Sequence, residues 1–523
     1  MAFPPGSRRK GGNVMKGVNF SRRACLCLFG LIVGFLAVVS LFFTCTFTGR
    51  EHIRFQGDAP LLHLLLFAAL LLGLLGLRRA GLYSLALRRE KLLVPALMGL
   101  YALGLLLCLH VSKSLPIFDQ ERCVALARAL AQGNPEAFRS QYYAQYFPFQ
   151  IPYILYCACL ALLEGGESYL PYQLANVLWI MVCLWALPKC AALALGEERL
   201  ELVFLISLLP FLPMPLYVSF VYGNVPGLAL LLLGALQLIR YLRDHRPARL
   251  GFMGLFFLGA ALMKMNYLIG VIAAAILLVL DAIRRKGLWQ SAAALLMVLL
   301  CACSTSLVVR LTERFTGGDF SQGFPTSSWV LLGLQEDGAA PGWYTNRAYE
   351  LYAQAGENKA ATDLLCREAI AQRLQAFQDP GYAASFFWEK AVSQWNEPSF
   401  ESLSINRLAR NPERSPLALS LYEGRGEKLA LGWMNLYHSL ILLGLVLWVL
   451  LEGRKASLAS LYFPLYFLGG FLFHLLWEAK SQYTLAYFFC LLPYGAMGYL
   501  ALVRRLHRGG RVPEAPRPDA PDA

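Results

Sequence analysis

Long apolar runs alternate with short polar or basic segments along most of the chain. A helix needs about 20 apolar residues to cross a bilayer, and several runs reach that length. The apolar runs cover residues 24–47, 61–77, 92–111, 149–164, 172–194, 201–220, 225–242, 251–265, 267–283, 288–309, 431–451, 457–477 and 483–503. The pattern predicts an all-α polytopic membrane protein with about 12–14 transmembrane helices.

Basic residues concentrate in the segments between apolar runs, as they do in cytoplasmic loops. Placing Arg240–Arg249 inside and Asp119 outside leaves a parity problem, because the interval 148–224 then has one run too many. One run there must be re-entrant, half-length or split. The three prolines within 210–215 mark the favoured place, since proline breaks the hydrogen-bond ladder of a helix.

The polar segments divide the chain into six parts. These are a basic cytoplasmic tail at 1–23, an N-terminal transmembrane hairpin at 24–91, a transmembrane core at 92–309 with an outer loop at 112–147, an extracytoplasmic domain at 310–430, C-terminal transmembrane helices at 431–503 and a disordered cytoplasmic tail at 504–523. The domain at 310–430 has enough aromatic and apolar residues to fold, and we expect it to be small and helical. Both termini are expected in the cytoplasm.

Composition supports a membrane protein and argues against nucleic-acid binding. The 523 residues are 57% hydrophobic and only 15% charged, whereas soluble domains carry about 25% charged residues. The net charge of +14 reflects loops between spans, so no nucleic-acid partner is expected. Most of the 13 cysteines lie inside apolar runs, and their spacing resembles neither a zinc site nor a disulfide framework.

Two carboxylates follow the third apolar run, in the stretch Pro116–Arg122. Charges beside a bilayer are costly and commonly mark functional sites. Asp119 is the candidate general base, because a carboxylate can accept a proton from an incoming hydroxyl. Glu121 and Arg122 are its candidate partners.

Two further charged groups fall on the same predicted outer face. Lys264 lies at a turn between two apolar runs, and Glu478, Lys480 and Tyr483 lie between the last two. Ammonium and guanidinium groups can hold a phosphate. Together with Asp119, they are the parts needed to transfer a group from a lipid phosphate to an acceptor hydroxyl.

Each candidate also has a purely structural interpretation. Asp119 could cap the helix that follows, and Glu121 could be first-turn charge favoured by the helix dipole. Lys264 could extend to lipid headgroups, and Glu478 with Lys480 could form a local interfacial pair.

Three short motifs carry a resemblance to a known group. They are Asp119-x-Glu121 in the first large outer loop, Tyr146–Gln150 leading into the next apolar run, and Trp477–Tyr483 before the last one. With these motifs, residues 92–503 resemble bacterial GT-C glycosyltransferases. Within that group the chain is most similar to the protein-mannosyltransferase-like (glycosyltransferase family 39-like) membrane enzymes of Gram-positive bacteria.

The resemblance implies an activity and a place. It implies transfer of a sugar, with inversion, from a polyprenyl-phosphate donor to a hydroxyl of an envelope glycan, lipid or protein. The reaction would occur on the outer face of a bacterial plasma membrane. Such chemistry requires no cofactor, and it is compatible with a divalent metal ion at the site.

The resemblance also implies roles for individual residues. Asp119 would be the general base, and Glu121 would help to orient the site. Arg122, Lys264 and Lys480 would bind the lipid phosphate. Glu478 and Tyr483 would belong to the same substrate-binding set. The chain departs from some relatives in lacking a lysine at Tyr146–Phe149.

A transporter or flippase of lipid-linked envelope intermediates is the main alternative, because charges and proline-broken helices near the membrane also suit transport. Two features argue against it. The sequence shows no inverted repeat, and the charges gather on one predicted face, whereas a carrier would place them near the midplane. A scaffold would leave Asp119 and Lys264 unexplained.

Overall fold

The computed structural model describes residues 6–49, 52–164, 168–285, 287–338, 340–409 and 411–509. The structure is 80% helical with almost no strand, and the chain is an all-α polytopic membrane protein. Within the described residues, ten helices are long and apolar enough to cross a membrane. The number rises to eleven when one bent pair counts as a single span.

The N-terminal part contains one departure from the expected transmembrane hairpin. Its elements are α1 (Gly6–Phe42), β1 (Phe43–Gly49), β2 (His52–Gly57), α2 (Pro60–Arg79), α3 (Leu82–Arg88) and α4 (Glu90–Ser112). Residues 6–23, expected as a disordered tail, form the first part of α1, and residues 1–5 lie outside the described range. Phenylalanine and threonine alternate in β1, a period that favours an antiparallel strand over a continued helix.

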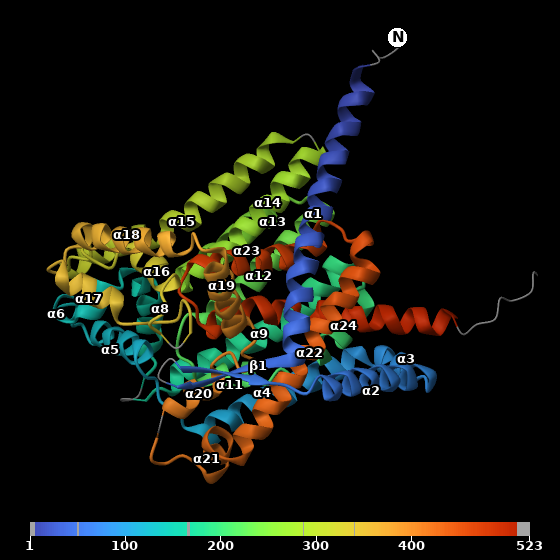
Figure 1. Cartoon of the computed structure of the whole chain (residues 1–523), viewed down its shortest axis with the longest axis horizontal. Coiled ribbons are helices and arrows are strands. Elements are labelled where there is room, and N and C mark those ends of the chain that lie inside the picture. The colour runs from blue at the N-terminus through green and yellow to red at the C-terminus, as the bar shows by residue number, and fades with distance from the viewer. Residues whose placement is uncertain are drawn as a thin grey trace, which may run out of the picture.

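The membrane core is a bundle of helices from both halves of the chain (Figure 1). Its helices are α9 (Leu170–Leu195), α10 (Glu201–Leu208), α11 (Pro213–Leu216), α12 (Asn224–Asp244), α13 (Ala248–Met263), α14 (Leu268–Arg285), α15 (Leu288–Thr316), α22 (Arg425–Glu452), α23 (Tyr462–Leu476) and α24 (Ser481–Gly509). The backbones of α22 and α24 approach closely, because a Cβ at Gly498 would lie 1.9 Å from the Gly444 carbonyl oxygen. Small residues allow such close packing between membrane helices. The expected tail beyond residue 509 lies outside the described residues.

The loop after α4 folds into α5 (Asp119–Ala131), α6 (Ala137–Ser140), α7 (Tyr142–Tyr146) and α8 (Ile151–Ala161). Both ends of α8 lie on the same face of the molecule as α5. Gln150, before its start, contacts the Tyr222 hydroxyl, and Glu164, after its end, pairs with Arg128 of α5 at 2.5 Å. Because α8 returns to the face from which it starts, it accounts for the surplus run between residues 148 and 224.

The proline-rich run is broken as expected, but it still connects the two faces. The helical segments Glu198–Leu208 and Pro213–Ser219 are bent by 62°. At one end Glu198 pairs with Arg243, and at the other Ser219 donates to Asn406 at 2.6 Å. The prolines therefore bend a span, and it is the α8 segment that stays on one face.

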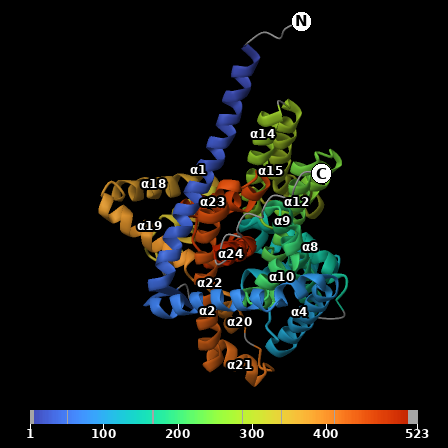
Figure 2. The ribbon, with the colours of Figure 1, turned by 90° about the vertical axis from the view of Figure 1, so that its right-hand side faces the viewer.

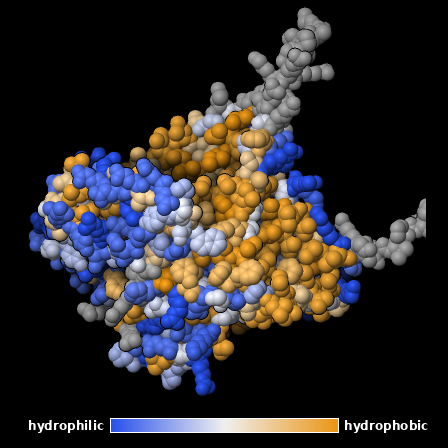
Figure 3. All heavy atoms as spheres, in the orientation of Figure 1, coloured by the Kyte–Doolittle hydropathy of each residue, from blue (hydrophilic) through white to orange (hydrophobic). Residues whose placement is uncertain are grey.

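A helical segment between α15 and α22 covers the face that carries Asp119. It contains α16 (Thr326–Gly333), α17 (Arg347–Gln354), α18 (Lys359–Ala376), α19 (Pro380–Trp395), α20 (Ser402–Leu408) and α21 (Pro416–Glu423). Figure 2 shows α18 and α19 projecting beside the bundle, with α20 and α21 near the start of α22. In Figure 3 the surface over α16–α18 is polar, and the surface over α2, α22 and α24 is apolar.

The path of α8 makes a prediction about accessibility. In a variant without the natural cysteines, single cysteines at Ser168 and Asn358 should react with an impermeant maleimide from the same side of sealed vesicles. A cysteine at Arg246, on the opposite face, should react only from the other side. If the cysteine at Ser168 were labelled together with that at Arg246, α8 would cross the membrane and this fold would be wrong.

Candidate functional site

Asp119 is the first residue of α5, where the chain takes an unusual turn. Phe118 occupies the N-cap position with φ 52° and ψ −124°, and no side chain caps the helix. Positive φ is uncommon for residues other than glycine, so the surrounding structure must hold this turn. The N-cap role considered for Asp119 is not seen, and its carboxylate is left for other interactions.

The Asp119 side chain is open to solvent on one side and surrounded by protein on the others. This burial raises the pKa of Asp119. Four groups oppose the rise, in order of decreasing effect: Lys480, the Tyr143 hydroxyl, Arg122 and Lys264. The structure thus brings three cations from three separate elements around one carboxylate.

Lys264 lies in the turn between α13 and α14 and reaches the start of α12. Its Nζ donates to Asn224 Oδ1 at 2.7 Å and lies 4.8 Å from the centre of the Tyr483 ring. Gly223 permits this approach, because a Cβ there would lie 2.0 Å from the Met263 carbonyl oxygen.

Burial lowers the pKa of Lys264 to about 7, and the nearby carboxylates Glu478, Glu401 and Asp119 oppose that change. An ammonium with such a pKa can switch its charge near neutral pH.

The segment Trp477–Lys480, between α23 and α24, is held by backbone hydrogen bonds to the covering segment. The Glu478 amide donates to the Trp329 carbonyl at 3.2 Å, and the Ala479 amide donates to the Gly342 carbonyl at 2.7 Å. The ring of Trp477 also stacks on that of Trp329. The charged groups of this loop are therefore placed by residues about 140 positions earlier in the chain.

Lys390 of α19 also holds this loop, through hydrogen bonds to backbone carbonyl groups. Its side chain is fully buried, and its Nζ donates to the carbonyls of Leu475 and Trp477, both at 2.9 Å, and to that of Gly333. Burial lowers the pKa of Lys390 to about 7. In the charged form, the three protons of the ammonium match these three acceptors. It joins α16, α19 and the end of α23 into one unit.

Glu478 and Lys480 of this loop face the site, together with Tyr483 in the first turn of α24. The Tyr483 hydroxyl donates to Glu478 Oε2 at 3.0 Å, and Lys480 Nζ lies 5.3 Å from the Tyr344 ring centre. Glu478 raises the pKa of Lys264 more than any other neighbour does. The loop therefore supplies both a cation beside Asp119 and a carboxylate that favours the charged form of Lys264.

A buried carboxylate network supports the loop from the covering segment. The hydroxyl of Ser481 donates to Glu397 at 2.7 Å and to Glu401 at 3.3 Å. Glu397 also accepts the amides of Ser399 and Glu401, at 3.0 and 2.8 Å. Phe400 and Glu401 both have positive φ, at 50° and 60°. Burial raises the pKa of Glu397, and these hydrogen bonds oppose the rise.

Sequence reasoning did not identify Glu401, Tyr143, Tyr222 or Asn224 as part of the site. Glu401 lies in the segment 394–406, which is almost entirely buried in the structure. The other three give no local pattern, because tyrosine and asparagine are common near membrane surfaces.

Glu121 and Arg122 differ in placement. Glu121 follows Asp119 by two positions, which puts it on another face of α5. Its side chain is exposed and has no hydrogen-bond or ion-pair partner among the described residues. Arg122 follows Asp119 by three positions, on the same face, and its guanidinium lies 4.8 Å from the centre of the Tyr142 ring.

Two cavities lie outside this cluster. The larger, of about 840 Å³, lies between α16 and α18, and the smaller, of about 490 Å³, lies between α4 and α9. Among the residues that the structure describes, no group of three or more His, Cys, Asp or Glu side chains is arranged to hold a metal ion.

The three hydrogen bonds of Lys390 predict a stability effect. Lys390→Met should leave three buried carbonyls without a donor and destabilise the protein by roughly 3 kcal/mol. Thermal unfolding in detergent would measure this loss. Lys428→Met is the control, because Lys428 is exposed at the start of α22. Equal unfolding temperatures for the two variants would contradict the role given to Lys390.

Comparison with protein-family models finds no matching family for this chain. Comparisons with curated proteins and with solved structures find no match either. The resemblance to GT-C glycosyltransferases therefore stays a prediction from the motifs quoted above.

Proposed function

We propose that this protein transfers a sugar from a polyprenyl-phosphate donor to an acceptor hydroxyl on the extracytoplasmic side of the membrane. One observation carries the proposal. Asp119, a carboxylate open to solvent, lies next to Lys480, Arg122 and Lys264, on the face where the helices end. A base for a hydroxyl and cations for a phosphate are thus available at one place.

The mechanism follows from these groups. Asp119 accepts the proton of the acceptor hydroxyl as its oxygen attacks the anomeric carbon. The bond between that carbon and the phosphate oxygen breaks, and the phosphate leaves with the electron pair from the opposite side, so the configuration inverts. Lys264, Lys480 and Arg122 stabilise the charge on the departing phosphate. Positioning supplies the rest of the acceleration.

The smaller cavity offers a lipid donor an approach to the site. It opens between α4 and α9, beside Ser114 and Leu115, which lead to Asp119. Leucines line much of it, while Lys113 and His110 supply polar groups at its edge. An isoprenoid chain and its charged phosphate need that combination of surfaces.

Exchange of the proposed base should abolish transfer. In proteoliposomes supplied with a panel of labelled polyprenyl-phosphate sugars and a cell-envelope acceptor extract, Asp119→Asn should lower the rate by about 10²–10⁴-fold, the usual contribution of a general base. Glu136→Gln is the matched control, since Glu136 is an exposed carboxylate of the same loop that forms an ion pair with Arg139 on the surface.

The same assay separates the transferase from a carrier. If the wild type moves labelled lipid between leaflets and consumes none of it, the chain is a transporter. Equal rates for Asp119→Asn and Glu136→Gln would remove Asp119 from the reaction.

The raised pKa of Asp119 and the lowered pKa of Lys264 predict a narrow pH profile. As pH rises, kcat/KM should increase while Asp119 loses its proton, and then fall through about pH 7 as Lys264 loses its charge. Lys264→Arg should remove the fall at high pH, because a guanidinium stays charged there. If the arginine variant kept the alkaline limb of the wild type, another group would be responsible for it.

A further inference from the structure

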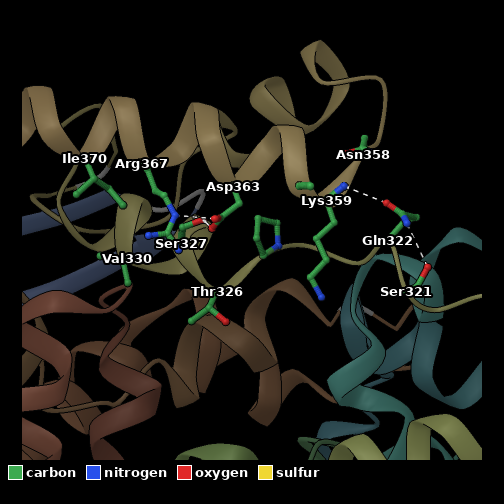
Figure 4. A pocket seen from close by; sticks show the side chains of 12 residues that line it. Ser321, Gln322, Thr326, Ser327, Val330, Asn358, Lys359, Asp363, Arg367 and Ile370 are labelled. Carbon is green, nitrogen blue, oxygen red and sulfur yellow. Dashed lines mark hydrogen bonds and ion pairs between the residues drawn. The ribbon is translucent and has the colours of Figure 1, made fainter.

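The larger cavity lies on the covering segment, apart from the Asp119 cluster. It measures about 840 Å³, within the usual range of ligand sites. Its walls are the first turns of α16 and α18 and the segment that precedes α16 (Figure 4). The cavity is open to solvent on one side, so it can admit the end of a long molecule.

The lining mixes hydrogen-bonding groups with apolar walls. Ser321, Gln322, Thr326 and Asn358 offer hydroxyls and amides, and Val330 is among the apolar residues. Hydroxyls and amides can both donate and accept hydrogen bonds, which suits a ligand with many hydroxyl groups. The chemistry of the lining thus fits a sugar better than an apolar compound.

Two backbone donors at the start of α18 are already used. The Lys359 amide donates to Gln322 Oε1 at 3.1 Å, and the Ala361 amide donates to Asn358 Oδ1 at 2.9 Å. Within the described residues, no hydrogen bond engages the Ala360 amide, so a ligand can use this amide together with the side chains of the lining.

The charges in the cavity favour an anionic ligand. Asp363 is satisfied internally, because it accepts from the Ser327 hydroxyl and from Arg367 Nε, both at 2.6 Å. Lys359 extends across the cavity, and Figure 4 joins its terminal nitrogen to no other drawn residue. Within the described part of the chain, no hydrogen bond or ion pair engages that nitrogen. The charged residues of the lining are the cations Lys359 and Arg367 and the carboxylate Asp363, so the net charge of the lining is positive.

From these features we infer that the cavity is a binding site for a glycan carrying an anionic group, with Lys359 as the residue that contacts the charge. A phosphate and a carboxylate on the glycan present the same chemistry to Lys359. The assignment of this glycan as the acceptor of the transferred sugar rests on the proposed function. Binding of the glycan in the cavity does not.

Helix α16 connects the cavity with the candidate active site. Thr326, Ser327 and Val330 line the cavity. On the same helix, the Trp329 carbonyl accepts the Glu478 amide, and the Trp329 ring stacks on Trp477. A glycan held in the cavity would therefore rest on the helix that also holds the loop of Lys480.

The test measures binding to the full-length protein in nanodiscs by fluorescence anisotropy. The probes are labelled maltotriose phosphate, a labelled trigalacturonate and neutral labelled maltotriose. We expect at least one anionic probe to bind more tightly than the neutral one. Lys359→Gln should weaken binding of that probe by about 1.5-fold to fivefold, the usual range for one exposed charge pair. It should leave binding of neutral maltotriose unchanged.

Arg347→Gln is the matched control, because Arg347 is an exposed cation of the same segment that pairs with Glu350 outside the cavity. Stronger binding of the phosphate probe would identify phosphate as the anionic group, and stronger binding of the galacturonate would identify carboxylate. The inference is overturned if neither anionic probe is preferred, or if Lys359→Gln and Arg347→Gln bind alike.

Asp119→Asn distinguishes the two proposals. That variant should bind the anionic probe as the wild type does, since Asp119 lies outside the cavity lining. If the wild type binds the anionic probe but transfers no sugar in proteoliposomes, the proposed function is refuted and the glycan site stands.

Discussion

The candidate site depends on how the Trp477–Lys480 loop is attached to the covering segment. Two backbone hydrogen bonds, to Trp329 and Gly342, fix the path of the loop. The buried ammonium of Lys390 donates hydrogen bonds to three carbonyl groups next to it. Carbonyl groups at the end of a membrane helix are costly when they have no hydrogen-bond donor, and this attachment supplies the donors. The same contacts place Lys480 beside Asp119. Stability and the geometry of the site thus rest on shared hydrogen bonds.

Charge balance is the second constraint on the site. Lys264, Lys480 and Arg122 would repel one another in surroundings poor in water, and they remain together because Asp119, Glu478 and Glu401 lie among them. Such a set is close to neutral without substrate. A lipid phosphate would add negative charge where the lowered pKa of Lys264 indicates that positive charge is least stabilised. Phosphate binding and protonation of Lys264 would therefore reinforce each other.

The sequence predicted the parts of the structure that depend on local pattern. Apolar length predicted about 12–14 transmembrane helices, and the described residues contain ten that are long and apolar enough, or eleven when the bent pair counts as one span. The path of α8 was not predicted, although the apolar run at 149–164 is shorter than the about 20 residues that a crossing helix needs, because neighbouring runs of similar length were also counted as spans. What decides its path is the pairing of Arg128 with Glu164, a long-range contact. Glu401 was missed for the same reason, since its partner Ser481 is 80 residues away.

The position of the charges bears on the choice between an enzyme and a carrier. Asp119, Lys264 and the Trp477–Lys480 loop all lie where helices end, on the face that also carries α5 and α16. A carrier must expose its site alternately to both faces, which favours a site near the midplane flanked by two movable halves. Here the covering segment is bonded to the loop through Lys390, Trp329 and Gly342, so opening towards the opposite face would break buried hydrogen bonds without replacing them. A fixed site on one face is what a transferase with a membrane-bound donor and a water-borne acceptor requires.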